Sequence, residues 1–279
     1  MVVARVSTDL FKAAVILARM AVADRQKPAP GELFVDHLSH FVADLGAAAR
    51  AFEALGMKVT PTSVQVTADG PVGASNRCVM LDEGYIELLS PTHDTPSARR
   101  LRAYMGRYTG VHLVCFGTPD AEGEQLRLQA HGFEAQLIEF ERKVEGGVAR
   151  FKAVRVPPET MPEGRIQYVQ QLAPEHVWLP GFVNEPRLDE VYVVASDPVE
   201  AAARWARFTG LLPSPQGQSV RLKATRGSIV IGTRAAIVGL LGDAPPAPGI
   251  AGYALRHPGG GTARCIELAA AVGGSVVFG

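Results

Sequence analysis

Apolar and polar residues alternate through residues 35–42 with the two-residue period of a β-strand. One face of this strand carries Val35, His37, Ser39 and Phe41, and the other carries Leu38, His40 and Val42. An amphipathic helix is predicted directly after the strand, and it needs an apolar face to lie on. The second set is therefore expected to be the packed side, and His37 is predicted to face the space that the sheet encloses.

A second strand, with the sequence GYIELLSP, is predicted over residues 84–91. Its alternation puts Tyr85, Glu87 and Leu89 in one row. A carboxylate flanked by apolar residues is costly to bury without a cation or a hydrogen-bond donor, which favours a role for Glu87. An imidazole and a carboxylate that both face the open side of a sheet are half of a divalent-metal site.

The pattern of strand, helix and glycine recurs three more times along the chain, which indicates an internal repeat. In the first three copies an aspartate precedes the helix, at Asp44, Asp120 and Asp197, where its side chain can cap the first turn. The fourth copy, residues 250–279, is degenerate and short. It keeps a strand, a turn, a predicted helix and a glycine, but its later strands are largely missing.

The repeat predicts an α+β fold of βαβββ modules, in which curved mixed sheets form ligand cups and one helix per module lies outside. Residues 1–31 are assigned to an N-terminal helical extension and residues 32–180 to a first domain of modules 1 and 2. Residues 181–279 are assigned to a second, partly degenerate region of modules 3 and 4. A short helix is expected within the arginine-rich linker over residues 91–110.

Two motifs carry a resemblance to a known family: DHLSHFVADL, followed by a helix and a Leu-Gly turn, and the late E-L-L-x-P strand. Together they resemble the vicinal oxygen chelate superfamily, and most closely its glyoxalase-like branch. The resemblance implies that both domains are glyoxalase-like, and that the metal ligands include His37 and Glu87. Glu87 is also the residue for which a catalytic role is predicted.

The second copy is expected to supply the remaining metal ligands. Counting back from Asp120 as His37 lies from Asp44 leads to Leu113, but a one-residue insertion in GTPD would bring His112 to the inward position. Counting back from the prolines that follow the late strands, Pro91 and Pro174, matches Glu87 to Gln170. Gln170 is then predicted to be either a weak metal ligand or an amide that lines the cavity. Two further glutamines of that strand, Gln167 and Gln171, are predicted to face the other way and to be structural.

Three residues near the first site are candidates for substrate binding. Asn76 and Arg77 offer amide and guanidinium donors to an oxyanion, although a solvated turn is the favoured interpretation of the pair. Tyr85 shares its row with Glu87. In the third and fourth copies, Glu190 and Tyr253 occupy the position that His37 has in the first. These two copies are therefore interpreted as having lost the site and as serving to complete the fold or a dimer surface.

Two kinds of metal chemistry are open. A set of His37, His112 and Glu87 suits Fe(II) and oxygen chemistry, in the manner of extradiol dioxygenases of the same superfamily. If Gln170 joins them, a Zn, Ni or Mn ion could hold two vicinal oxygens of a substrate and stabilise an enediolate, as in a lyase or isomerase of glyoxalase type. The competing interpretation is a metal-free protein that sequesters a small molecule, as bleomycin-resistance proteins do.

The net charge and the cysteines indicate which classes of binding partner and which compartment to expect. Lysine plus arginine and aspartate plus glutamate number 28 each, so no net field favours nucleic acid or an anionic membrane. A small-molecule substrate and a possible homodimer are expected. The three cysteines, Cys78, Cys115 and Cys265, show no zinc or redox spacing and predict a reducing, cytoplasmic setting. The apolar run AAVILARMAVAD is interrupted by Arg19 and is interpreted as part of a helix rather than a signal peptide.

Overall fold

The computed structural model describes residues 23–24, 26–67, 70–144 and 147–279. Most of the predicted N-terminal extension, residues 1–22 and 25, lies outside the described residues. Within the described part of the chain, no helix has the length and apolar character that a membrane span requires.

The first two copies of the repeat fold as predicted, each with a strand, a helix and three more strands. Module 1 consists of β1 (Phe34–Phe41), α2 (Leu45–Glu53), β2 (Ser63–Thr67), β3 (Gly70–Met80) and β4 (Tyr85–Pro91). Module 2 consists of β5 (Gly110–Gly117), α4 (Ala121–Ala130), β6 (Gln136–Val144), β7 (Gly147–Arg155) and β8 (Arg165–Gln171). The linker between them forms the expected short helix, α3 (Pro96–Met105).

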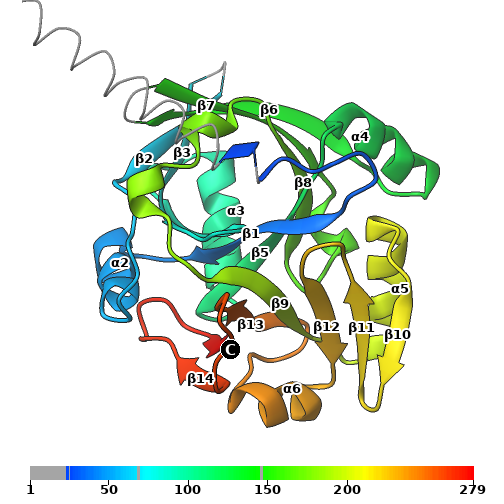
Figure 1. Cartoon of the computed structure of the whole chain (residues 1–279). Coiled ribbons are helices and arrows are strands. Elements are labelled where there is room, and N and C mark those ends of the chain that lie inside the picture. Colours follow the sequence, from blue (N-terminus) through cyan, green and yellow to red (C-terminus); the bar gives the residue numbers. More distant parts are fainter. Residues whose placement is uncertain (1–22, 25, 68–69, 145–146) are drawn as a thin grey trace, which may run out of the picture.

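These two modules close into one barrel within a single chain. The strands follow each other in the order β1, β4, β3, β2, β6, β7, β8 and β5, and β5 pairs with β1 to complete the ring. At one seam β1 and β5 run antiparallel, with His37 opposite Cys115, and at the other β2 pairs with β6. Figure 1 looks into this ring, with α2 and α4 outside it.

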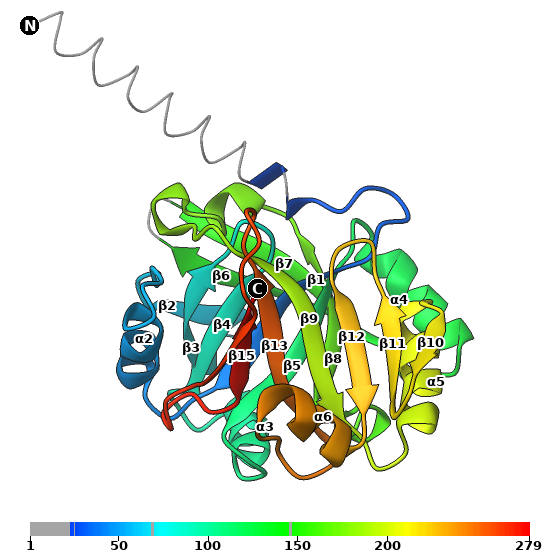
Figure 2. The ribbon, with the colours of Figure 1, turned by 60° about the horizontal axis from the view of Figure 1, so that its bottom comes forward.

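The third and fourth modules extend the same sheet beyond β5. Their elements are β9 (Arg187–Val194), α5 (Pro198–Thr209), β10 (Pro213–Gln216), β11 (Ser219–Lys223), β12 (Ser228–Gly232), α6 (Arg234–Leu241), β13 (Gly249–Arg256), β14 (Arg264–Glu267) and β15 (Ser275–Phe278). Strand β13 runs antiparallel to β9, as β5 does to β1, and it joins the barrel where Ile250 lies opposite Val111 (Figure 2). Three short 3₁₀ turns, Pro158–Thr160, Pro174–His176 and Pro180–Phe182, lie in the connections.

The prediction of a helix inside the fourth copy is wrong. Residues 264–267 form β14 instead, which pairs antiparallel with β15, and β15 lies parallel to β13. The flanking glycine-rich segments disfavour a helix, and pairing with β15 satisfies the backbone of this stretch. A helix does form before this module's first strand: α6 precedes β13 and begins after the capping residue Thr233.

The predicted helix caps are confirmed. The side chains of Asp44, Asp120 and Asp197 each accept hydrogen bonds from backbone amides in the first turn of the following helix. Helix α5 ends at Gly210, whose φ of 76° is a left-handed conformation that glycine adopts without strain. These repeated signals fix where each helix begins and where the chain returns to the sheet.

Two apolar layers lie on opposite sides of the barrel wall. Leu38 and Val42 of β1 pack outward in one cluster with Phe52 of α2, as the alternation predicted. Phe41 packs inward in a second cluster with residues of β3, β4 and β5 and with Leu101 of α3. Val35 belongs to the outer cluster rather than the inner one, because the pairing of β1 with β5 is irregular between Val35 and His37.

Candidate ligand-binding site

His37 and Glu87 line one cavity inside the barrel. They lie on neighbouring parallel strands, where His37 is opposite Tyr85 and Ser39 is opposite Glu87. The His37 ring stacks on the Tyr85 ring, with the two centroids 4.3 Å apart. Two of the four predicted metal ligands, and one of the predicted substrate contacts, are thus brought together.

The carboxylate of Glu87 is buried and held by three donors. Ser39 Oγ donates to Oε2 at 2.5 Å, while Asn76 Nδ2 and Gln65 Nε2 donate to Oε1 at 2.5 and 3.2 Å. Burial alone would raise the pKa of Glu87, but the charge of His37, these hydrogen bonds and Arg142 outweigh it and hold the pKa below its ordinary value. Glu87 is therefore an ionised carboxylate whose oxygens already accept hydrogen bonds from the protein.

His37 is held by a second carboxylate, Asp36. His37 Nδ1 donates to Asp36 Oδ1 at 2.6 Å, and Gln171 Nε2 donates to the other oxygen of Asp36 at 2.6 Å. Burial would lower the pKa of His37, but the neighbouring Cys115 and the hydrogen bond with Asp36 raise it to about 10. This raised pKa favours the protonated ring, and a metal ion at His37 would require the neutral imidazole.

Module 2 presents no matching pair of ligands to this cavity. Among the described residues, its strands β5 and β8 contribute Leu113, Arg165, Gln167 and Val169 to the lining. Gln167 is committed to other groups, since its Oε1 accepts from Arg155 Nε at 3.0 Å and its Nε2 lies 3.6 Å from the sulfur of Cys115.

His112 does not line this cavity. Its Nε2 donates to the backbone oxygen of Tyr108 at 2.9 Å, and its ring centroid lies 4.2 Å from that of Tyr108. Its Nδ1 is buried and has no hydrogen-bond partner among the described residues. Burial lowers its pKa to about 4. The pairing of β5 with β1 is irregular at His112, since Ser39 lies opposite Leu113 and His40 opposite Val111. Leu113 lines the cavity, as the simple count from Asp120 indicated.

Gln170 lies outside the barrel, at the start of α4. Its Oε1 accepts from the amide of Ala121 at 3.2 Å, and its Nε2 donates to the backbone oxygen of Pro119 at 2.7 Å. The predicted facing of the glutamines in this strand is thus reversed, because the prolines after the two strands are not equivalent. The strand starts give the correct match: GYIE and GRIQ align Glu87 with Gln167.

Asn76 and Arg77 lie on opposite faces of β3. Asn76 is buried inside, where it holds Glu87 and accepts from Ser63 Oγ. Arg77 donates to the backbone oxygen of Thr60 at 2.8 Å outside the cavity. Of this pair, only Asn76 reaches the predicted site, and it does so as a support for Glu87.

Three arginines of the site were missed by the sequence analysis. Arg142, Arg155 and Arg165 line the cavity beside Glu87. Arg142 is 4% exposed and its Nε has no hydrogen-bond partner in the described part of the chain. The alternation in β6 and β7 could have indicated two of them. Arg142 lies on the same face of β6 as Phe140, and Arg155 lies on the same face of β7 as Phe151.

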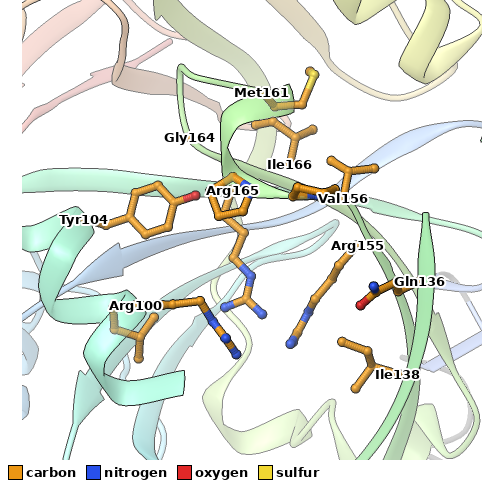
Figure 3. Close-up of a pocket in the computed structure, with 13 residues that line it drawn as sticks. Arg100, Tyr104, Gln136, Ile138, Arg155, Val156, Met161, Gly164, Arg165 and Ile166 are labelled. Carbon is orange, nitrogen blue, oxygen red and sulfur yellow. The ribbon is translucent and has the colours of Figure 1, made fainter. Parts of the chain in front are cut away.

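A larger cavity of about 190 Å³ adjoins this one and shares Arg155 and Arg165 with it. It lies between α3 and the ends of β6, β7 and β8, and Figure 3 shows its lining. The inner cavity, with about 30 Å³, has room for only a water or two. A ligand therefore has its main volume at this outer cavity and can extend only a small group toward Glu87.

The residues of the site do not fit a resident metal ion. Among the described residues, no group of three or more His, Cys, Asp or Glu side chains is arranged to hold one. His37 and Glu87 are two donors of the right kind, but both are engaged by protein groups, and the opposite module adds neither a carboxylate nor an imidazole.

The corresponding position of the third module is also occupied by protein contacts. Glu190 pairs with Arg221 and accepts from the hydroxyl of Tyr192 at 2.8 Å. Tyr253 of the fourth module is fully buried, and its hydroxyl lies 3.3 Å from His40 Nε2.

Comparison with known proteins gives one family match. Residues 35–209 match the family described as a glyoxalase-like domain. No curated protein sequence matches the chain. The match spans modules 1 and 2 and the start of module 3, and therefore includes the whole barrel.

Two solved structures share the fold. A hypothetical protein from Staphylococcus aureus superposes with a TM-score of 0.71 at 15% identity, covering 88% of this chain and 99% of its own. A variant of 4-hydroxymandelate synthase from Streptomyces coelicolor superposes with a TM-score of 0.51 at 16% identity, covering 81% of this chain and 71% of its own. At these identities the likeness shows the fold alone.

Proposed function

Because the chain belongs to the glyoxalase-like domain family of the vicinal oxygen chelate superfamily, we propose that its barrel binds a small molecule without a resident metal ion. The ligand lies in the outer cavity, beside Arg155 and Arg165, and its inner end faces Glu87. This is the sequestration alternative that was predicted from the sequence.

One observation carries the proposal: the donor set is incomplete on the side of module 2. Where module 1 has His37 and Glu87, the described residues of β5 and β8 present Leu113, Val169, the cation Arg165 and a glutamine that is already bonded. The imidazolium of His37 and the carboxylate of Glu87, which accepts from three donors, form the polar inner end of the proposed ligand site. They offer a hydrogen-bond donor and a negative charge, which select for the group that reaches them.

A second candidate is a metal-dependent enzyme, as the sequence analysis predicted. It is favoured by the position of His37 and Glu87 in one cavity on neighbouring strands. In that case Zn, Ni, Mn or Fe(II) would be held between them, and a lyase, isomerase or dioxygenase reaction would follow. Binding would require His37 to lose its proton and Glu87 to exchange the donors that it has.

Metal content separates these candidates. We expect less than 0.1 equivalent of bound metal by mass spectrometry after the protein is incubated with Zn²⁺, Ni²⁺, Mn²⁺ or, anaerobically, Fe²⁺ and then desalted. His37→Ala and Glu87→Gln should give the same value as the wild type. About one equivalent in the wild type that is lost in both variants would refute the proposal and support the enzyme.

A further inference from the structure

Among the described residues, the lining of the outer cavity contains three arginines and no carboxylate, and Glu87 of the adjoining inner cavity is the acid that acts on two of them. Arg100 of α3, Arg155 of β7 and Arg165 of β8 line it, and Figure 3 shows their guanidinium groups pointing toward one another. Within the described residues none of the three forms an ion pair. Their hydrogen bonds to side chains are those of Arg155 to Gln167 and of Arg100 to Ser97, and Arg165 has none.

This arrangement is unfavourable for the protein alone. Like charges repel, and Arg155 and Arg165 are half-buried, so their charges are partly withdrawn from water at a cost in free energy, whereas Arg100 is exposed. Burial, together with Arg165, lowers the pKa of Arg155 well below its ordinary range, and burial also lowers that of Arg165. Arg99, which is exposed like its neighbour Arg100 on α3, differs in having a carboxylate partner, since it forms two hydrogen bonds with Asp94.

The rest of the lining is apolar. Leu101 and Tyr104 of α3, Ile138 of β6, and Val156 and Met161 of the β7–β8 connection face the same space. A fully hydrated inorganic ion would leave these surfaces without contacts. The occupant that fits both features has a compact apolar body and an anionic head group.

We propose that this cavity is an anion subsite, in which Arg155, Arg165 and Arg100 bind the phosphate or the paired carboxylates of a small aromatic or aliphatic organic acid. The inference rests on the proposed function and names its ligand class. Guanidinium groups match the planar spacing of carboxylate and phosphate oxygens and donate charge-assisted hydrogen bonds to them. Arg165, which donates no hydrogen bond to a side chain in the described part of the chain, contributes most.

Calorimetric titration with phenyl phosphate and with phthalate tests the proposal, with benzyl alcohol as the neutral probe. We expect at least one of the anions to bind the wild-type protein with a Kd below about 1 mM, and the neutral probe to bind at least tenfold more weakly. Arg165→Gln and Arg155→Gln should each weaken the anion at least tenfold. Arg99→Gln, the matched control on α3, should change the Kd less than twofold.

A second readout is independent of the ligand chosen. Removing one of three repelling charges should raise the melting temperature of ligand-free Arg165→Gln by about 2–4 °C, whereas a purely structural arginine would lower it. Failure of both anions to bind at 10 mM, or equal binding to wild type and Arg165→Gln, would overturn the inference. Binding of benzyl alcohol as tight as that of the anions would also overturn it, while the proposed metal-free binding function would stand.

Discussion

Replacing Asn76 by alanine is expected to reduce the free energy of unfolding by about 3 kcal/mol, because it leaves a buried carboxylate short of a donor. Asn76 Nδ2 donates to Glu87 Oε1 at 2.5 Å, and its own oxygen accepts from Ser63. Both partners remain buried or half-buried in the variant, so neither regains full hydration. Chemical denaturation at pH 7.5 measures the loss.

The pH dependence of this loss follows from the pKa of Glu87, which is lower than its ordinary value of 4.5 in the folded protein. A carboxyl group with a lowered folded pKa stabilises the fold above its unfolded pKa, and this contribution is lost as the pH falls through the folded pKa. Asn76→Ala should raise the folded pKa, so the difference between the variant and the wild type should shrink below about pH 4.

Gln65→Ala is the matched control for this variant. Gln65 donates to the same oxygen at the longer distance of 3.2 Å from a half-exposed position, so its loss should cost less than about 1 kcal/mol. Equal costs for the two variants, or a cost for Asn76→Ala that does not change with pH, would show that Asn76 does not stabilise the charge on Glu87.

Glu163→Ala is expected to destabilise the protein by about 4 kcal/mol, since it removes one partner of a buried ion pair. Glu163 is 1% exposed and accepts from two nitrogens of Arg204, each at 2.8 Å, and from Trp205 Nε1 at 3.1 Å. It lies between β7 and β8 of the barrel, and Arg204 and Trp205 lie on α5. The pair therefore links module 2 to module 3.

Two further variants isolate this pair. Glu200→Ala, which removes the exposed carboxylate on the other side of Arg204, should cost less than about 1 kcal/mol. The double variant Glu163→Leu with Arg204→Leu should recover part of the loss, because no unpaired charge remains buried. A Glu163→Ala variant as stable as Glu200→Ala would contradict the importance of this contact.

The sequence predicted the architecture because the signals of the fold are local and repeated. The aspartate caps at Asp44, Asp120 and Asp197 and the apolar stripes of the helices mark each module, and the alternation in β1 shows which side of the strand faces α2. Closure of the barrel depends on the pairing of β2 with β6, about seventy residues apart, and no local pattern specifies it.

The site was less predictable, since one residue of error in a strand reverses every side chain. Counting back from Pro174 matched Gln170 to Glu87, although Gln167 occupies that position. The assumed insertion in GTPD predicted that His112 faces the cavity, whereas Leu113 does. The arginines were missed for another reason. Arg100, Arg155 and Arg165 come from three separate elements, and only the folded chain brings them together.

The most direct test is a crystal structure grown with both Zn²⁺ and phenyl phosphate, with anomalous data collected at the zinc absorption edge. We predict density for the phosphate between Arg155 and Arg165, and no anomalous peak between His37 and Glu87. An anomalous peak within bonding distance of both His37 and Glu87, with no phosphate at the arginines, would contradict the account.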